Sequence, residues 1–255
     1  MKITFTPTRE DSPITLDRDG DALIVNGLRF DFSDLPEGAD LPAVAVQTTY
    51  ITGTVTRTDG QLSLKVRLPH GQNAPHEAKF PDPITVDTDG SIDLPAFDIL
   101  TDEDGNAQEV HGEAPSVTSD GLIDWSQMVT VKDKAQEANT ARREAVNTER
   151  TRRLELGTTI NVTGYGLIPV QGRDQDQITI LALENSARDL MAAGVTDPVI
   201  PFRDRDNGDH TLTPSQVLEL MRKAKAFAQT VYQASWVLKD ADPVPEDYTD
   251  DKYWP

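Results

Sequence analysis

The sequence predicts an α+β protein with a β-rich N-terminal half and a mainly helical C-terminal half. Asp-Gly pairs between alternating apolar and polar residues recur through residues 1–125, a pattern typical of hairpins. Glycine and proline are absent from residues 127–156, which favours one long helix. We therefore expect a β-rich domain (1–125), a connecting helix (126–157), a small α/β module (158–240) and an extended acidic-aromatic tail (241–255).

The N-terminal domain is predicted from its turns. Asp-Gly suits tight hairpins that require positive φ at successive positions, and the runs on both sides of Asp59-Gly60 alternate as half-buried strands do. Proline-containing joints interrupt the strands, so a small open sheet or sandwich is expected. The pairs are Asp19-Gly20, Asp59-Gly60, Asp89-Gly90, Asp104-Gly105 and Asp120-Gly121.

The predicted connecting helix, which Gly157 should end, has a narrow apolar stripe that consists mostly of alanine. Such a stripe buries little apolar surface, so two alternatives stay open. In the first, the helix packs flat on its own protein or connects the two halves through solvent. In the second, it pairs with copies of itself as a coiled coil, for which a trimer is favoured. The stripe is Met128, Val131, Ala135, Ala138, Ala141 and Ala145.

The C-terminal module is predicted to combine short strands with two helices. Residues 159–170 indicate two strands around a glycine turn, and residues 174–193 indicate a helix. After a strand near residues 199–204, a final helix should begin at Thr213, which caps it. Its apolar positions recur at helical spacing and predict a buried face. They include Val217, Leu218, Met221, Ala224, Phe227, Ala228, Val231, Tyr232 and Ser235.

The last fifteen residues contain three prolines, five acidic side chains, two tyrosines and one tryptophan. This composition predicts an extended tail outside any core. Tyr248, Tyr253 and Trp254 are the predicted partner-binding residues, because aromatic side chains are frequent anchors in protein interfaces. In the alternative, the tail lies on its own domain.

The charge distribution argues against nucleic acid. Residues 1–125 carry 8 basic and 23 acidic side chains, a net charge of −15 within a total of −19, and phosphates would be repelled. No run approaches the roughly 18 apolar residues that span a bilayer, so no membrane partner is expected. The first residues lack the apolar stretch of a signal peptide, so no secretory leader is expected. Zero cysteines exclude disulfides and thiolate sites.

Two acidic segments resemble calcium loops but do not keep the required positions. Asp17, Asp19 and Asp21 are the calcium candidates, yet the glycine and glutamate that an EF-hand needs are replaced by Ala22 and Leu28, and a hairpin turn explains the residues. The segment from Asp204 to His210 also has its glycine at the wrong position. Its Asp/Asn/Gly composition is typical of a turn that leads a strand into a capped helix.

No catalytic constellation is present. The four histidines have no i,i+4 pairing, and the sequence contains neither a Gly-x-Ser-x-Gly elbow nor a phosphate-binding Gly-Lys-Ser/Thr loop. We therefore predict no catalytic residue, no cofactor and no enzymatic activity. The histidines are His70, His76, His111 and His210.

Residues 155–240 resemble a phage-encoded domain of unknown function that is common toward the C-terminus of proteins encoded among tail-fibre and tail-tip genes. A vaguer resemblance links Leu35-Pro36-Glu37-Gly38 and Leu68-Pro69-His70-Gly71 to the β-rich halves that accompany this domain in bacterial prophages. The motifs that carry the main resemblance are Gly164-x-Gly166, Phe202-Arg203-Asp204-x-Asp206-Asn207, Leu212-Thr213-Pro214-x-Gln216-Val217 and Ser235-Trp236-x-Leu238-Lys239-Asp240.

The resemblance implies a structural component of a bacteriophage tail, at the tip, the baseplate or a fibre-attachment point. Such a protein would be made in the cytoplasm of the host bacterium and located in the virion, with other tail proteins as its partners. Two alternatives remain: a tail-fibre assembly chaperone, and a host-surface carbohydrate-binding protein that uses the Asp-rich N-terminal loops. The family has no established enzymatic residues, so the resemblance assigns none here.

Overall fold

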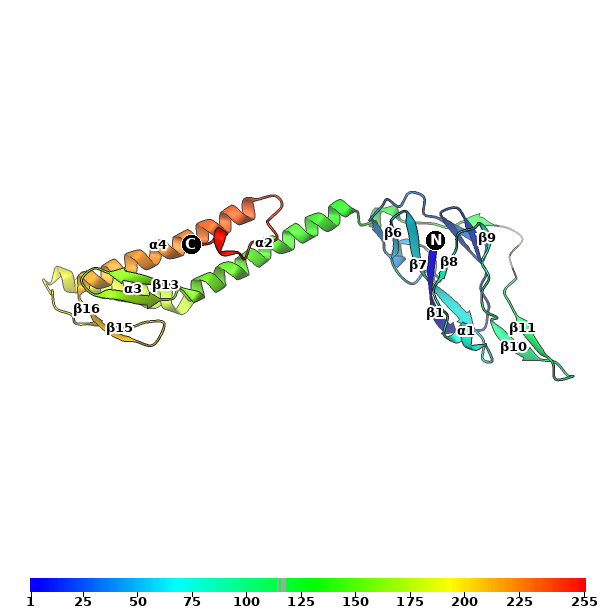
Figure 1. Ribbon diagram of the computed structural model, residues 1–255, viewed down its shortest axis with the longest axis horizontal. Coiled ribbons are helices and arrows are strands. Elements are labelled where there is room, and N and C mark those ends of the chain that lie inside the picture. The colour runs from blue at the N-terminus through cyan, green and yellow to red at the C-terminus, as the bar shows by residue number, and fades with distance from the viewer. Residues whose placement is uncertain (114, 116–117) are drawn as a thin grey trace. The chain divides into compact units, whose positions relative to one another are not determined.

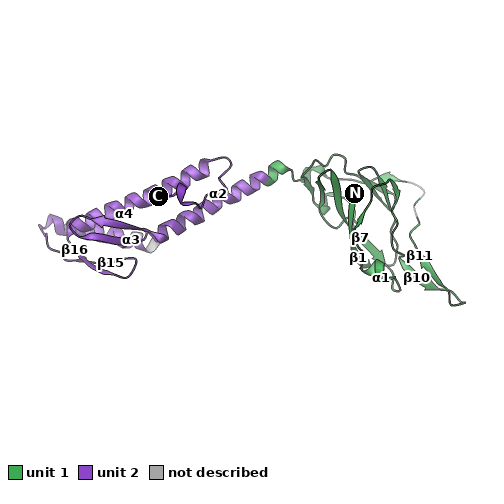
Figure 2. Ribbon diagram, viewed as in Figure 1, with its two compact units in different colours: residues 1–134 green, residues 135–255 purple. Residues whose placement is uncertain are grey.

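The computed structural model describes residues 1–113, 115 and 118–255, apart from the side chains of residues 174, 175 and 177 (Figure 1). The chain forms two compact units, residues 1–134 and residues 135–255 (Figure 2). Unit 1 contains β-sheets, whereas unit 2 contains long helices with two hairpins, so the predicted α+β class is confirmed. No helix in the described part of the chain is apolar enough over a sufficient length to cross a membrane.

Unit 1 contains two five-stranded sheets, with strand orders β5-β6-β7-β1-β8 and β12-β4-β3-β2-β9, and a separate β10-β11 hairpin. Its helical segments are η1 (Ala43–Ala45), α1 (His76–Lys79) and η2 (Trp125–Gln127). Its strands are β1 (Lys2–Arg9), β2 (Leu16–Asp19), β3 (Ala22–Val25), β4 (Leu28–Asp31), β5 (Asp40–Leu41), β6 (Val55–Thr58), β7 (Gln61–His70), β8 (Ile84–Thr85), β9 (Gly90–Ser91), β10 (Asp98–Thr101), β11 (Ala107–Val110) and β12 (Ser119–Asp120).

Both five-stranded sheets contribute to one hydrophobic core. In β7, alternate residues are buried, as expected when one face of a strand packs inward. Ile3 from β1 and Phe30 from β4 are fully buried in the same cluster. A core shared between two sheets is the arrangement of a sandwich.

The hairpin predicted at Asp59-Gly60 is confirmed. Thr58 pairs with Gln61, and Asp59 and Gly60 take φ values of 52° and 74°. The Glu37 carboxylate accepts hydrogen bonds from the amides of Asp59 and Gly60, at 2.6 and 3.0 Å. The two central residues of the turn therefore adopt positive φ, and the Glu37 carboxylate accepts hydrogen bonds from their backbone amides.

Unit 2 is built around two long helices and two hairpins. The helix α2 (Val131–Leu156) begins in the last residues of unit 1 and continues into unit 2, and Gly157, at φ 69°, follows its end as predicted. The other elements of unit 2 are β13 (Thr158–Val162), β14 (Gly166–Val170), α3 (Asp174–Ala192), β15 (Ile200–Arg203), β16 (Asp209–Leu212), α4 (Pro214–Asp240) and η3 (Asp251–Tyr253).

The predicted start of the final helix is confirmed at α4. The Thr213 hydroxyl accepts from the Gln216 amide at 3.2 Å, and the Gln216 side chain accepts from the Thr213 amide at 3.0 Å. This reciprocal capping box satisfies two backbone donors at the helix N-terminus. Val217 and Met221 are buried beneath the two hairpins and α3 in one core cluster.

The prediction of an extended tail is wrong, and the alternative, a tail that lies on its own domain, is confirmed. Val244 is fully buried and Trp254 is 7% exposed. The Val244 amide donates to Asn139 of α2 at 2.8 Å, and the Trp254 indole donates to the Tyr248 carbonyl at 2.7 Å. The aromatic side chains remove apolar surface from water by packing against α2 and α4.

The turn around Asp204 also differs from its prediction, because it joins β15 to β16 rather than a strand to a helix. Asn207 has a φ of 65°, and Asp204 accepts hydrogen bonds from the amides of Asp206 and Gly208. A turn between two strands favours Asp, Asn and Gly as much as the start of a helix does. Composition alone therefore predicted a helix after this turn where the structure has a strand.

The apolar stripe of α2 is exposed over its first turns. Val131 is 56% exposed, and Ala135, Ala138 and Ala141 are also exposed. The tail contacts the helix at Asn139, and the buried apolar residues of the helix, Val146 and Leu154, lie further along. The coiled coil and the solvated helix therefore both stay open as predictions.

Candidate functional site

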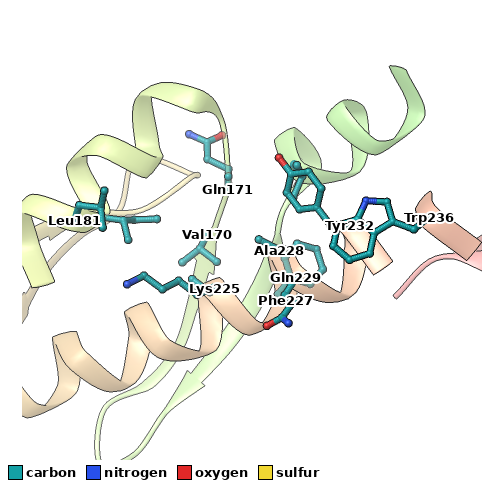
Figure 3. Close-up of a pocket in the computed structure, with 13 residues that line it drawn as sticks. Val170, Gln171, Leu181, Lys225, Phe227, Ala228, Gln229, Tyr232 and Trp236 are labelled. Atoms are coloured by element: carbon teal, nitrogen blue, oxygen red, sulfur yellow. The ribbon is translucent and has the colours of Figure 1, made fainter. Parts of the chain in front are cut away.

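An apolar groove of about 440 Å³ opens in unit 2 between α4, the start of α3 and the end of β14 (Figure 3). Its volume lies within the usual range of ligand-binding sites. Figure 3 shows Leu181 on one side and Tyr232 with Trp236 on the other. The lining residues are Leu154, Val170, Gln171, Gly172, Ile180, Leu181, Ala224, Lys225, Phe227, Ala228, Gln229, Tyr232 and Trp236.

The groove follows from side-chain sizes along α4. Residues 224, 228, 232 and 236 are spaced four apart, so their side chains follow one another along one side of the helix. The first two are alanines, which leave space, and the last two are Tyr232 and Trp236. Gly172, which has no side chain, leaves further room opposite them.

Large apolar side chains are exposed at the mouth of the groove. Leu181 is 55% exposed and Trp236 is 52% exposed, and both line the groove. Ile178, one turn before Leu181, is 73% exposed. Several large apolar side chains exposed together are more informative than single ones, since such patches are typical of binding sites.

Beside the groove, in an adjoining pocket, lies a guanidinium without a carboxylate partner among the described side chains. Arg150 lies 4.9 Å from the centre of the Tyr232 ring, and its Nη1 donates to the Asn147 side chain at 3.2 Å. Arg150 and Tyr232 also line an adjoining pocket of about 490 Å³ together with Arg173 and Glu155.

The two other cations near the groove whose contacts are described, Arg173 and Lys225, are already paired. Asp176 holds Arg173 through two hydrogen bonds of 2.9 and 3.1 Å, and with Glu155 it raises the pKa of that guanidinium. Lys225 donates to Glu184, and this contact is the main cause of the lowered pKa of the glutamate. Arg150 is therefore the cation most available to an incoming carboxylate.

A second polar cluster links the two hairpins of unit 2. The Asp204 carboxylate bonds His210 Nε2 at 2.9 Å, and His210 Nδ1 bonds the Tyr165 hydroxyl at 2.8 Å. When Nε2 donates to the carboxylate, Nδ1 accepts from the phenol. The hydrogen bond from His210 is the largest cause of the lowered pKa of Asp204. Because Asp204 also accepts hydrogen bonds from the backbone amides of its own turn, this cluster holds the two hairpins in place.

Glu219 performs a similar structural role on α4. Its carboxylate accepts from the amide and the hydroxyl of Thr163, at 3.1 and 2.9 Å, and pairs with Lys223 at 2.7 Å. These contacts, with Lys223 first, lower the pKa of Glu219 to about 2. The carboxylate thereby joins the turn between β13 and β14 to the helix that forms one side of the groove.

The calcium candidates lie at the β2–β3 hairpin, so the interpretation of these residues as a hairpin turn is confirmed. Asp19 pairs with Ala22 across the β2–β3 turn, and its carboxylate bonds Arg29 at 3.0 Å. Asp21 bonds Arg57 at 2.8 Å. Asp17 lies in β2 opposite Ile24. Among the described residues, no three or more His, Cys, Asp or Glu side chains gather as a metal site would require.

The predicted partner-binding aromatic residues lie together, but against their own unit. Trp254 is buried, and Tyr248 and Tyr253 pack on the same cluster. In this conformation these side chains are used by the domain itself. The aromatic residues at the groove, Tyr232 and Trp236, were assigned to a buried helix face or to a motif rather than to a site. The available signal was the spacing of two alanines and two aromatic residues four apart.

The part of the chain that contains the groove matches a known protein family. Residues 137–252 match the family described as Domain of unknown function (DUF4376). No curated protein and no solved structure matches the chain. The matched span begins within α2 and includes nearly all of the tail, in agreement with the packing of the tail on α2 and α4. Unit 2 therefore carries a DUF4376 domain at residues 137–252.

Proposed function

We propose that this chain is a structural component of a bacteriophage tail, at the tip, the baseplate or a fibre-attachment point, and that it acts through protein–protein contacts. The observation that carries the contact function is the groove with its exposed apolar mouth, at Leu181 and Trp236. Exposed apolar groups of this kind cost free energy in water and are typically covered in a complex.

The chemistry of the groove supports binding rather than catalysis. Its lining contains no serine, histidine or acidic side chain, and its one amine, Lys225, is paired with Glu184. A nucleophile with an adjacent base is thus missing from the described side chains that line it, whereas apolar and aromatic surface is abundant.

The tail assignment is supported by the sequence resemblance of residues 155–240, which lie within the DUF4376 span. We also propose that the chain self-associates, with a trimer favoured, through the exposed stripe that includes Val131, Ala135 and Ala138. Other tail proteins would then be the partners of the groove, and the virion would be the final location after synthesis in the host cytoplasm.

Mass spectrometry of purified particles, from the phage that encodes this chain, tests the proposal. We expect the chain to be retained in particles after gradient purification, in a constant ratio to the major tail protein. The infected-cell lysate is the control for expression. A chain that is abundant in the lysate and absent from particles contradicts the structural role and favours the assembly chaperone.

A further inference from the structure

We propose that the groove of unit 2 binds a peptide segment of another protein that places apolar side chains next to a carboxylate. The inference rests on the proposed function in one respect, namely that the occupant is a protein. It adds the chemistry of that occupant and the residues that recognise each part of it.

The length of the groove favours a peptide over a compact ligand. Along α4 the lining extends from Ala224 to Trp236, which corresponds to about 18 Å at the rise of an α-helix. An extended peptide covers such a length with about five or six residues. Apolar side chains of that peptide would fill the space above Ala224 and Ala228, between Leu181 and Tyr232.

Arg150 specifies the charge of the occupant. The guanidinium is held against the face of Tyr232, and it makes no ion pair with a described carboxylate. A planar guanidinium binds a carboxylate through two parallel hydrogen bonds, and its location beside an apolar groove strengthens that pairing. Charge complementarity therefore favours an acidic residue, or a C-terminal carboxylate, beside the apolar side chains.

The occupant is inferred to come from another protein because the matching segment of this chain is already in use. The C-terminal tail carries acidic and aromatic residues side by side, at Asp250, Asp251, Tyr253 and Trp254. Trp254 is buried in its own unit, and Asp251 pairs with Arg153 at 2.5 Å. Releasing the tail to fill the groove of a second copy would uncover this core.

Peptide-display selection on the immobilised full-length chain tests the inference, with random 12-residue peptides as the probe. We expect enriched peptides to combine apolar side chains with Asp or Glu. Ala228→Phe should fill the groove and weaken their binding at least tenfold. The matched control is Ala226→Phe, the same change at an exposed position of α4 outside the groove, which should bind like the wild type.

Two further variants separate charge from shape and allow for misfolding. Arg150→Glu should weaken the acidic peptides at least tenfold, whereas Arg143→Glu, at an exposed position of the same helix, should change binding less than twofold. Trp236→Ala removes a side chain that is half exposed, so it should keep the fold and still lose binding. Circular dichroism verifies folding for every variant.

Peptides that bind Ala228→Phe and Trp236→Ala as well as the wild type would overturn the inference, as would equal losses for the two arginine variants. Concentration-dependent self-association that Ala228→Phe abolishes would overturn it too, because the occupant would then be a second copy. Each of these outcomes is distinct from failure of the proposed function, which is decided by the presence of the chain in purified particles.

Discussion

Replacing Trp254 with alanine is expected to lower the free energy of unfolding of unit 2 by about 3 to 5 kcal/mol. The indole is 7% exposed, donates to the Tyr248 carbonyl at 2.7 Å, and lies 5.7 Å from the Arg153 guanidinium. Its loss would leave a cavity between the tail and the two long helices and a carbonyl without its donor. Urea unfolding followed by the helical circular dichroism signal measures this, because the long helices belong mainly to unit 2.

Trp236→Ala provides the matched control for this prediction. Trp236 is 52% exposed on α4, so the same substitution should change the unfolding free energy by less than about 1 kcal/mol. Equal effects of the two substitutions would show that the tail is not part of the core of unit 2. Unit 2 would then be stable without its last residues.

Replacing Glu149 with glutamine is expected to destabilise unit 2 by about 2 to 3 kcal/mol at neutral pH. The carboxylate is buried in α2 and bonds Arg152 twice, at 2.7 Å, and Arg153 once, at 2.6 Å. Arg153, which is 11% exposed, also bonds Asp251 and the Thr249 carbonyl. Removing the negative charge of Glu149 leaves the buried Arg153 guanidinium with less charge compensation. It also weakens the attachment of the tail, which Arg153 contacts.

The effect of Glu149→Gln should depend on pH. The hydrogen bond from Arg152 is the main cause that lowers the pKa of Glu149 below its ordinary 4.5. The native state therefore binds fewer protons than the unfolded state between these two pKa values, and stability falls as the pH is lowered through them. The difference between wild type and Glu149→Gln should be full at pH 7 and diminish below about pH 4.5.

Urea unfolding at several pH values checks this dependence, with Glu155→Gln as the control at an exposed position of the same helix. A difference that is constant from pH 7 to strongly acidic conditions would contradict the ionic role of Glu149. A large effect of Glu155→Gln would show that the substitution acts through the helix as a whole.

Local features of the fold could be predicted from the sequence because their causes are local. Asp59-Gly60 produces a two-residue hairpin since both residues adopt positive φ. Thr213 and Gln216 cap a helix since they are three residues apart. The parallel pairing of β1 with β7, from Lys2 opposite Ser63 to Arg9 opposite His70, was not predicted. Nothing in either strand specifies a partner about sixty residues away.

The site was harder to predict because its chemistry depends on what covers a helix face. Ala224, Phe227, Ala228 and Tyr232 belong to the apolar face of α4 that the sequence predicts to be buried. The structure covers that face only in part, and the uncovered part becomes the groove. The tail was mispredicted in the opposite sense. Its composition predicts that Trp254 is exposed, but long-range contacts with α2 bury this side chain.

Photo-crosslinking in purified particles tests most directly whether the groove is a protein-contact site. A photoreactive amino acid would replace Gln229, which lines the groove, or Ala226, which is exposed on α4 outside it. We expect a crosslink to another tail protein from position 229 and none from position 226. No crosslink from position 229, or equal crosslinking from both positions, would contradict the assignment of the groove as the contact site.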